Sequence, residues 1–186
     1  LGQEAYIPNF FRKAYRPVLY IPSKEEVKEL LQKMDIRTSH NSEQFRLDRE
    51  CKILFLLYFC CGLRLSEGRL LKWEHIDLDK GILTVLGSKG NKDRLVYLPQ
   101  DSLPVLKNYK ERQEMLFPGI DWAFPGKDPH KPVSCSGVES SFNRHWAMLP
   151  VARTVDKHPT PHCLRHAFVV ERFNEWMHQG IDTNTM

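Results

Sequence analysis

The sequence predicts a mainly α-helical domain of the α+β class with one small antiparallel three-stranded sheet. Apolar residues recur at helical spacing through most of the chain, and three short runs near its middle have strand composition. At 186 residues and 41% hydrophobic content, the chain has enough apolar material for one core. We therefore expect a single domain over residues 18–186, entered through a linker at residues 1–17.

The N-terminal part of the domain contains two predicted helices. Ser23 and Glu26 have the spacing of a capping box, and the apolar positions that follow predict a helix from about Lys24 to Met34. A polar connection occupies residues 38–44. Residues 53–61 are apolar on every face, as expected of a helix at the centre of a domain, and Gly62 ends that helix.

The middle of the chain predicts the sheet. Ser66 is placed to cap a short helix through Lys72. Runs with strand character then follow at three places: residues 73–78, 82–86 and 95–98. A tight turn at residues 79–81 joins the first two runs, and a longer basic tip at residues 87–94 joins the second and third. This order predicts an antiparallel meander.

Further helices are predicted after the sheet, each from a capping signal. The signals are Asp101 or Ser102 for a helix to about Met115, a capping box at Ser136–Glu139 for a helix over residues 142–149, and Thr160-Pro161 for a helix to about His178. Residues 122–132, rich in Pro and Gly, predict irregular structure between the first two of these helices.

Charge and cysteine usage limit the class of protein. The net charge of +4 and the pI near 8.8 permit a polyanionic partner without identifying one. The longest strongly apolar run, residues 53–61, is far shorter than the roughly 20 residues of a bilayer span, so we expect no membrane association. Five cysteines without CxxC spacing indicate reduced packing residues, and hence a cytoplasmic protein.

The N-terminus of the last predicted helix is the first candidate site. His162 and Arg165 lie three residues apart in its first turn and therefore on one side of it. A helix N-terminus attracts phosphate, and the Arg fork and the imidazole add charge-assisted hydrogen bonds and a proton acceptor. A cap and an ordinary surface charge would give the same spacing, which alone does not separate the two interpretations.

Arg64 and the basic tip are the other candidates. Arg64 lies in a tight turn between two predicted helices, so it either pairs with an acid such as Glu67 or faces a site that receives an anion. The tip carries Lys89, Lys92 and Arg94 among glycines. It either enters a groove of a nucleic acid or is a solvated basic turn.

In this order the three elements resemble the tyrosine recombinase (phage-type integrase) family. The sequence CGLRLSE matches its first Arg box, GSKGNKDR its lysine hairpin, and HCLRH its His-x-x-Arg box. The resemblance runs from about Arg16 to Met186 and implies the catalytic-domain fold of that family. It assigns catalytic roles to four residues: Arg64, Lys89, His162 and Arg165. Lys92 and Arg94 are expected to contact DNA.

The resemblance implies site-specific recombination of double-stranded DNA, by integration or excision, without a metal or other cofactor. In this family a tyrosine attacks the scissile phosphate, forms a 3′-phosphotyrosyl link and frees a 5′-hydroxyl. The two arginines would stabilise the pentavalent phosphorane, Lys89 would protonate the leaving oxygen, and His162 would handle the proton of the nucleophile. The resemblance also implies that the protein acts as a homo-oligomer on DNA. It further implies that a phage or another mobile element carries its gene.

The chain departs from the family pattern at its C-terminus. The family's third His or Trp box and its tyrosine follow the His-x-x-Arg helix, and nothing in this sequence matches either. All six tyrosines precede His162: Tyr6, Tyr15, Tyr20, Tyr58, Tyr97 and Tyr109. We therefore expect a catalytic domain truncated at its C-terminus and inactive alone, with residues 1–17 as the linker from an absent N-terminal DNA-binding domain.

Other functions could use the same residues. His162 and His166 could bind zinc at i, i+4, but the glutamate of an HExxH motif and a third ligand are missing. A metal-free phosphodiesterase with His162 and Lys89 as an acid and base pair would form no covalent protein adduct. A non-catalytic DNA-binding protein would lose only affinity when Arg64 and Arg165 are replaced.

Overall fold

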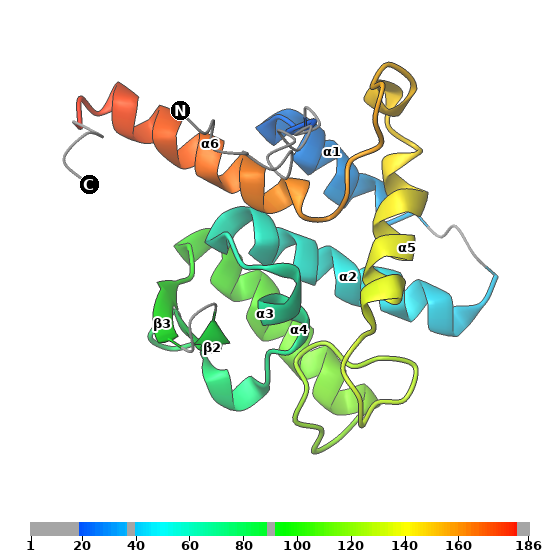
Figure 1. The fold of residues 1–186 in the computed structure, drawn as a ribbon. Coiled ribbons are helices and arrows are strands. Elements are labelled where there is room, and N and C mark those ends of the chain that lie inside the picture. The colour runs from blue at the N-terminus through cyan, green and yellow to red at the C-terminus, as the bar shows by residue number, and fades with distance from the viewer. Residues whose placement is uncertain (1–18, 37–39, 89–91, 182–186) are drawn as a thin grey trace, which may run out of the picture.

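The computed structural model describes residues 19–36, 40–88 and 92–181, and this part is mainly helical with one three-stranded sheet, as predicted (Figure 1). The α-helices are α1 (Lys24–Lys33), α2 (Ser42–Cys61), α3 (Leu65–Arg69), α4 (Leu103–Leu116), α5 (Cys135–Trp146) and α6 (Cys163–His178). The strands are β1 (Ile76–Asp77), β2 (Ile82–Ser88) and β3 (Lys92–Tyr97). Short 3₁₀ helices are η1 (Trp73–His75), η2 (Gln100–Ser102) and η3 (Pro150–Arg153).

Helix α2 forms the centre of the molecule. Its second half is the apolar run, with Leu54, Phe55 and Leu57 fully buried. The helix starts earlier than the predicted polar connection allowed, because the side chain of Asn41 accepts hydrogen bonds from the first free backbone N–H groups. It ends at Gly62 as predicted, where a φ of 61° favours glycine.

The other helices pack around α2. Helices α1 and α6 lie on one side of it, the sheet with α3 and α4 on the other, and α5 crosses one end (Figure 1). Edge-to-face packing of Phe55 on Phe142 joins α2 to α5, and within α5 the ring of Phe142 stacks on Trp146. Burying one such aromatic side chain contributes about 1.5–3 kcal/mol, so these contacts fix where α5 lies.

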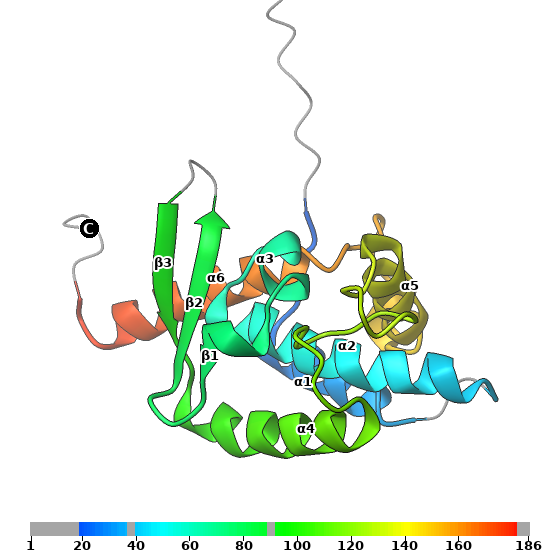
Figure 2. The same ribbon diagram turned by 90° about the horizontal axis from the view of Figure 1, so that it is seen from below.

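The sheet is an antiparallel meander in the order β1-β2-β3, as predicted. Figure 2 shows the strands side by side at one end of the molecule, with α4 leading away from the base of the sheet. The expected strand at residues 73–78 is wrong for its first half, which forms η1. The backbone at Lys72 and Trp73 pairs with residues 121 and 122 of the irregular segment instead, so only Ile76 and Asp77 join β2.

Two predicted caps are also wrong by two residues. Helix α3 is preceded by Arg64 rather than Ser66 and ends at Arg69, before Lys72. Helix α5 is capped by Ser134, whose Oγ accepts from the N–H of Gly137 at 3.0 Å, so it begins and ends earlier than its capping box predicted. At α3 the side chain of Glu67 accepts from the backbone N–H of Arg64, and at α5 a second serine, Ser134, precedes Ser136 by two residues.

A third predicted cap is also wrong: the N-cap of α6 is His162 rather than Thr160, so Pro161 lies before the helix. The other described helices match the expectations. The capping box of Ser23 and Glu26 is present, and α4 and α6 end within one residue of their predicted ends. No helix of the described ranges has the length and apolarity needed to cross a membrane. The predicted linker at residues 1–17 lies outside the described residues.

Candidate active site

Glu67 is the centre of the candidate site. It follows Arg64 by three residues, so the first turn of α3 brings the two side chains together. Its Oε2 accepts from the backbone N–H of Arg64 at 2.7 Å, and its Oε1 accepts from Arg64 Nη1 at 2.7 Å. The Glu67 side chain is only 6% exposed. The acid that the sequence offered as a partner for Arg64 is therefore its partner.

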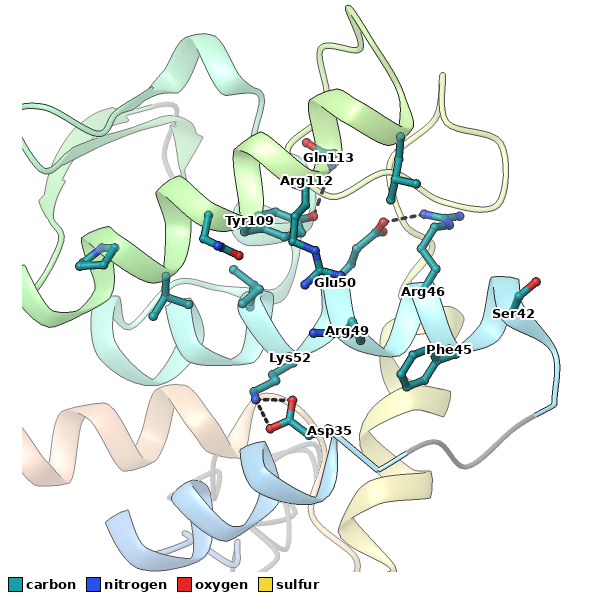
Figure 3. Close-up of a pocket in the computed structure, with 15 residues that line it drawn as sticks. Asp35, Ser42, Phe45, Arg46, Arg49, Glu50, Lys52, Tyr109, Arg112 and Gln113 are labelled. Carbon is teal, nitrogen blue, oxygen red and sulfur yellow. Dashed lines mark hydrogen bonds and ion pairs between the residues drawn. The ribbon is translucent and has the colours of Figure 1, made fainter.

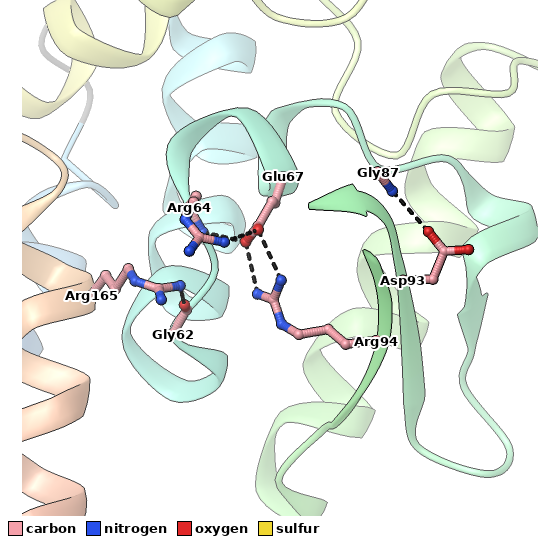
Figure 4. A network of polar contacts seen from close by, with 7 residues as sticks. All are labelled: Gly62, Arg64, Glu67, Gly87, Asp93, Arg94 and Arg165. Atoms are coloured by element: carbon pink, nitrogen blue, oxygen red, sulfur yellow. Dashed lines mark hydrogen bonds and ion pairs between the residues drawn. The ribbon is translucent and has the colours of Figure 1, made fainter. Parts of the chain in front are cut away.

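Arg94 reaches Glu67 from the sheet. Val85 of β2 is directly opposite Arg94 of β3, and opposed residues of an antiparallel pair project from the same face. Val85 is 2% exposed, so this face packs against the body of the molecule. Arg94 Nη1 and Nη2 donate to Oε1 and Oε2 of Glu67, both at 2.8 Å (Figure 4). This hydrogen bonding raises the pKa of Arg94.

Arg165 approaches the same place from α6. Its Nη1 donates to the carbonyl of Gly62, two residues before Arg64 (Figure 4). Gly62 also allows close packing, because a Cβ there would lie 2.4 Å from Phe168 of α6. A larger residue at position 62 would displace the ring of Phe168 on α6.

These four side chains form what we call the arginine cluster: Arg64, Arg94, Arg165 and Glu67. Burial lowers the pKa of Arg165, and the positive charges of Arg64 and Arg94 lower it further, while Glu67 opposes the shift. Three guanidinium groups against one carboxylate leave an excess of two positive charges. Such a cluster suits a phosphate, because guanidinium groups bind phosphate oxygens in bidentate geometry.

His162 lies beside the cluster at the start of α6, where it is the N-cap residue. Its ring packs edge-to-face on His166, with centroids 4.8 Å apart. Burial lowers the pKa of His162 below its ordinary value of 6.5, and the nearby His166, Arg165 and Arg64 lower it further. The imidazole is therefore mostly neutral at pH 7 and can accept a proton.

The basic tip of the hairpin is only partly described. Lys89 lies outside the described residues. Lys92 begins β3, where its backbone pairs with Ser88, and its side chain is outside the description as well. Below the tip, the backbone N–H of Gly87 donates to Asp93 Oδ1 at 2.9 Å, which ties the two strands together (Figure 4). The expected contact of Arg94 with DNA stays a prediction.

No motif or spacing along the chain indicated that Tyr20 lies near His162. Tyr20, His158, His162 and His166 all line a small cavity of about 120 Å³. The Tyr20 hydroxyl donates to the carboxylate of Glu26, with O–O distances of 2.7 and 2.8 Å. Burial and this carboxylate raise the pKa of Tyr20 to about 12.

The other described tyrosines are engaged elsewhere or lie on the surface. Tyr58 donates to the carbonyl of Leu65 at 2.9 Å and Tyr109 to the carbonyl of Ala123 at 2.7 Å. Burial raises both pKa values well above the ordinary value. Tyr97 is 73% exposed on β3. Tyr6 and Tyr15 lie outside the described residues.

A larger cavity of about 540 Å³ lies between α2 and α4 (Figure 3). Glu50 and Arg46 are in its wall, and Arg46 Nη1 donates to Glu50 Oε1 at 2.6 Å. Burial raises the pKa of Glu50 to about 7 although Arg46 opposes the shift. None of the residues that line this cavity belongs to the arginine cluster. Within the described ranges, no group of three or more His, Cys, Asp or Glu side chains could hold a metal ion.

Comparison with known proteins gives family and fold. The profile of the phage integrase family matches residues 23–179. The tyrosine recombinase XerA of Pyrococcus furiosus is 34% identical over 133 residues, which are 70% of this chain and 42% of that protein. XerC of Alcanivorax borkumensis is 35% identical over 150 residues, 80% of this chain and 46% of XerC. This chain spans less than half the length of either relative.

Solved structures with the same fold include two recombinases. The XerH site-specific recombinase bound to a palindromic difH substrate, a post-cleavage complex, aligns with a TM-score of 0.65 at 23% identity, over 83% of this chain and 42% of XerH. The XerA recombinase aligns with a TM-score of 0.63 at 21% identity, over 88% of this chain and 52% of XerA. The predicted fold, mainly helical with one small antiparallel sheet, is confirmed.

Proposed function

The chain belongs to the phage integrase family, whose relatives are tyrosine recombinases, and we propose that it is the catalytic domain of an enzyme for site-specific recombination of double-stranded DNA. The proposed reaction integrates or excises a DNA segment by cutting and rejoining strands through a 3′-phosphotyrosyl intermediate. It uses no metal or other cofactor, and the full-length enzyme acts as a homo-oligomer on DNA.

The observation that carries this proposal is the arginine cluster beside His162. Arg64 and Arg165 are 101 residues apart in sequence, yet both lie close enough to His162 to lower its pKa. Positive charge that is held in place before the reaction stabilises charge that develops on the phosphate, because little reorganisation is needed. A solvated surface arginine would not supply such a fixed field.

The proposed roles follow from which bonds form and break in the reaction and where each proton goes. The tyrosine oxygen forms a bond to phosphorus while the bond from phosphorus to the 5′ oxygen breaks. His162 accepts the tyrosine proton, and Lys89 gives a proton to the leaving 5′ oxygen. Arg64 and Arg165 bind the non-bridging oxygens of the phosphorane. Lys92 contacts the DNA backbone in this proposal.

We further propose that the nucleophile is a tyrosine C-terminal to Met186 in the full-length protein. In-line attack requires a nucleophile about 3 Å from phosphorus, and misplacement by an ångström can cost about 10²-fold. The hydroxyl groups of Tyr20, Tyr58 and Tyr109 are bonded to other groups, and their pKa values are raised, which opposes formation of the attacking phenolate.

The test is adduct formation on a nicked suicide substrate, followed by denaturing gel electrophoresis. The full-length protein is expected to form a covalent adduct, and residues 1–186 alone are not. An adduct on residues 1–186 that maps to any of their six tyrosines would overturn the assignment of the nucleophile. Cleavage by the full-length protein without any covalent adduct would instead favour the metal-free phosphodiesterase.

Lys89 is tested in the same assay. Lys89→Ala in the full-length protein is expected to slow cleavage by about 10² to 10⁴, the usual contribution of a general acid. A substrate with sulfur in place of the leaving 5′ oxygen needs no such proton, so it should restore the rate. If Lys92→Ala shows this rescue and Lys89→Ala does not, the general acid is Lys92.

A further inference from the structure

The two arginines that reach Glu67 contact it in different ways. Arg94 uses both terminal nitrogens, one on each carboxylate oxygen. Arg64 places one terminal nitrogen on Oε1, and its backbone N–H on Oε2. From these two arginines alone, each oxygen accepts two hydrogen bonds, and a carboxylate has four lone-pair positions. Arg94 occupies the bidentate position, and Arg64 is held end-on.

This division matters because Glu67 is largely shielded from solvent. A shielded carboxylate is costly unless cations and donors compensate it. Without Arg94, Glu67 would keep Arg64 as a cationic partner on its own helix, three residues away. The preferred geometry of such a pair is bidentate, so Arg64 would turn its second terminal nitrogen toward Glu67. Its charge would then be directed at the carboxylate rather than at a bound phosphate.

We propose that Arg94 is a positioning residue, which compensates Glu67 so that Arg64 stays end-on and acts on the scissile phosphate. This inference rests on the proposed function, since it concerns the same phosphate. The register of the sheet supports it: Arg94 opposes the buried Val85, so it projects toward α3.

The proposal differs measurably from a direct contact of Arg94 with DNA. If Arg94 acts through the charge of Glu67, replacing it should matter only while that charge is present. If Arg94 binds a DNA phosphate itself, replacing Arg94 should slow the reaction by the same factor with or without the charge of Glu67. A double-mutant cycle separates the two, because residues that act through one another are not additive.

The experiment measures the rate of adduct formation by the full-length protein on the nicked suicide substrate. Arg94→Gln is expected to slow the reaction about 10²-fold, the cost of a small displacement of Arg64. In a Glu67→Gln background, the same replacement is expected to cost less than about threefold, near the limit of additivity for independent residues. Arg94→Lys, which keeps the charge but loses the fork, is expected to fall between wild type and Arg94→Gln.

A matched control is the exposed pair of Arg172 and Glu175 on α6, in which Arg172 Nη1 and Glu175 Oε2 lie 2.7 Å apart. Arg172→Gln with and without Glu175→Gln is expected to leave the rate within about twofold in both backgrounds. Thermal melts of all variants identify any that fail to fold. If Arg94→Gln fails to fold, Arg94→Lys carries the same cycle.

Three outcomes are decisive. A wild-type protein that forms no adduct contradicts the proposed function, and the inference falls with it because Arg94 would have no scissile phosphate for which to position Arg64. If the wild-type protein reacts and Arg94→Gln slows adduct formation equally with and without Glu67→Gln, then Arg94 contacts DNA directly. That result overturns the inference. Rescue of Arg94→Gln by the 5′-sulfur substrate overturns it too, because the defect would then lie with the proton donor rather than with Arg64.

Discussion

Glu50 and Glu67 are both carboxylates on helices, both are largely shielded from solvent, and both contact arginine, yet their surroundings differ. The side chain of Glu50 is 9% exposed and that of Glu67 is 6% exposed. Glu67 accepts hydrogen bonds on both oxygens from two arginines. Glu50 accepts one bond, from Arg46, and its Oε2 has no partner among the described residues.

The difference shows that donors, rather than burial alone, decide what a shielded carboxylate does. Burial raises the pKa of Glu50 to about 7, because one arginine compensates only part of the lost solvation. Glu67 is compensated from two sides and serves as the anchor of the arginine cluster. We therefore expect replacements around Glu50 to change stability in a pH-dependent way, and replacements around Glu67 to change the reaction.

The largest effect on stability is expected from Arg46→Met. This replacement removes the cation beside Glu50 and also a hydrogen bond from Arg46 Nη2 to the carbonyl of Gly126. Breaking such a shielded pair costs about 3 to 5 kcal/mol of the free energy of unfolding when the carboxylate is ionised. Urea denaturation at pH 8 should show this loss, and at pH 5, where Glu50 is protonated, the loss should be smaller. Equal losses at both pH values would contradict the raised pKa of Glu50.

Glu50→Gln tests the raised pKa of Glu50 through the pH dependence of stability. The folded-state pKa of about 7 lies above the ordinary value of 4.5, so the folded protein binds this proton more tightly than the unfolded chain. Glu50 therefore costs nothing below pH 4.5, and its cost grows as the pH rises to 7. As the pH rises across this window, the free energy of unfolding of Glu50→Gln should increase relative to that of wild type by up to about 3 kcal/mol. Parallel pH profiles of the two proteins in guanidinium denaturation would argue against it.

The smallest effect is expected at an exposed carboxylate. Glu175→Gln removes the partner of Arg172, but both side chains are more than 40% exposed. Solvent compensates exposed charges well, so the free energy of unfolding should change by less than about 1 kcal/mol, with little dependence on pH. A change as large as that at Glu50 would mean that donors and burial do not distinguish these carboxylates.

Local signals in the sequence were sufficient for most of the architecture. The capping box at Ser23, the apolar run that ends at Gly62, and the helix to His178 depend on residues close together in the chain, and the structure contains all three. The motifs around Arg64 and His162 gave the family, which the profile match to residues 23–179 confirms. The pair of Arg64 and Glu67 was within reach too, because it lies within one helical turn.

Other features depended on contacts that no local pattern encodes. The strand expected at residues 73–78 lost its first half because Lys72 and Trp73 pair with a segment some 50 residues away. The N-caps of α3 and α5 lie two residues before the predicted ones, at Arg64 and Ser134. No local pattern indicated that Tyr20 would line the same cavity as His162, which lies more than a hundred residues further along the chain.

By itself the sequence determined most of the helices, the meander of the sheet and the family. Only the tertiary structure decided that Arg94 and Arg64 share one carboxylate, that Arg165 is held on the carbonyl of Gly62, and that Glu50 has a single arginine. The physical reason is the distance along the chain over which each kind of interaction acts. Caps and periodicity act over a few residues and can be read along the chain, whereas the compensation of a shielded charge depends on every donor that folding brings within about 3 Å of it.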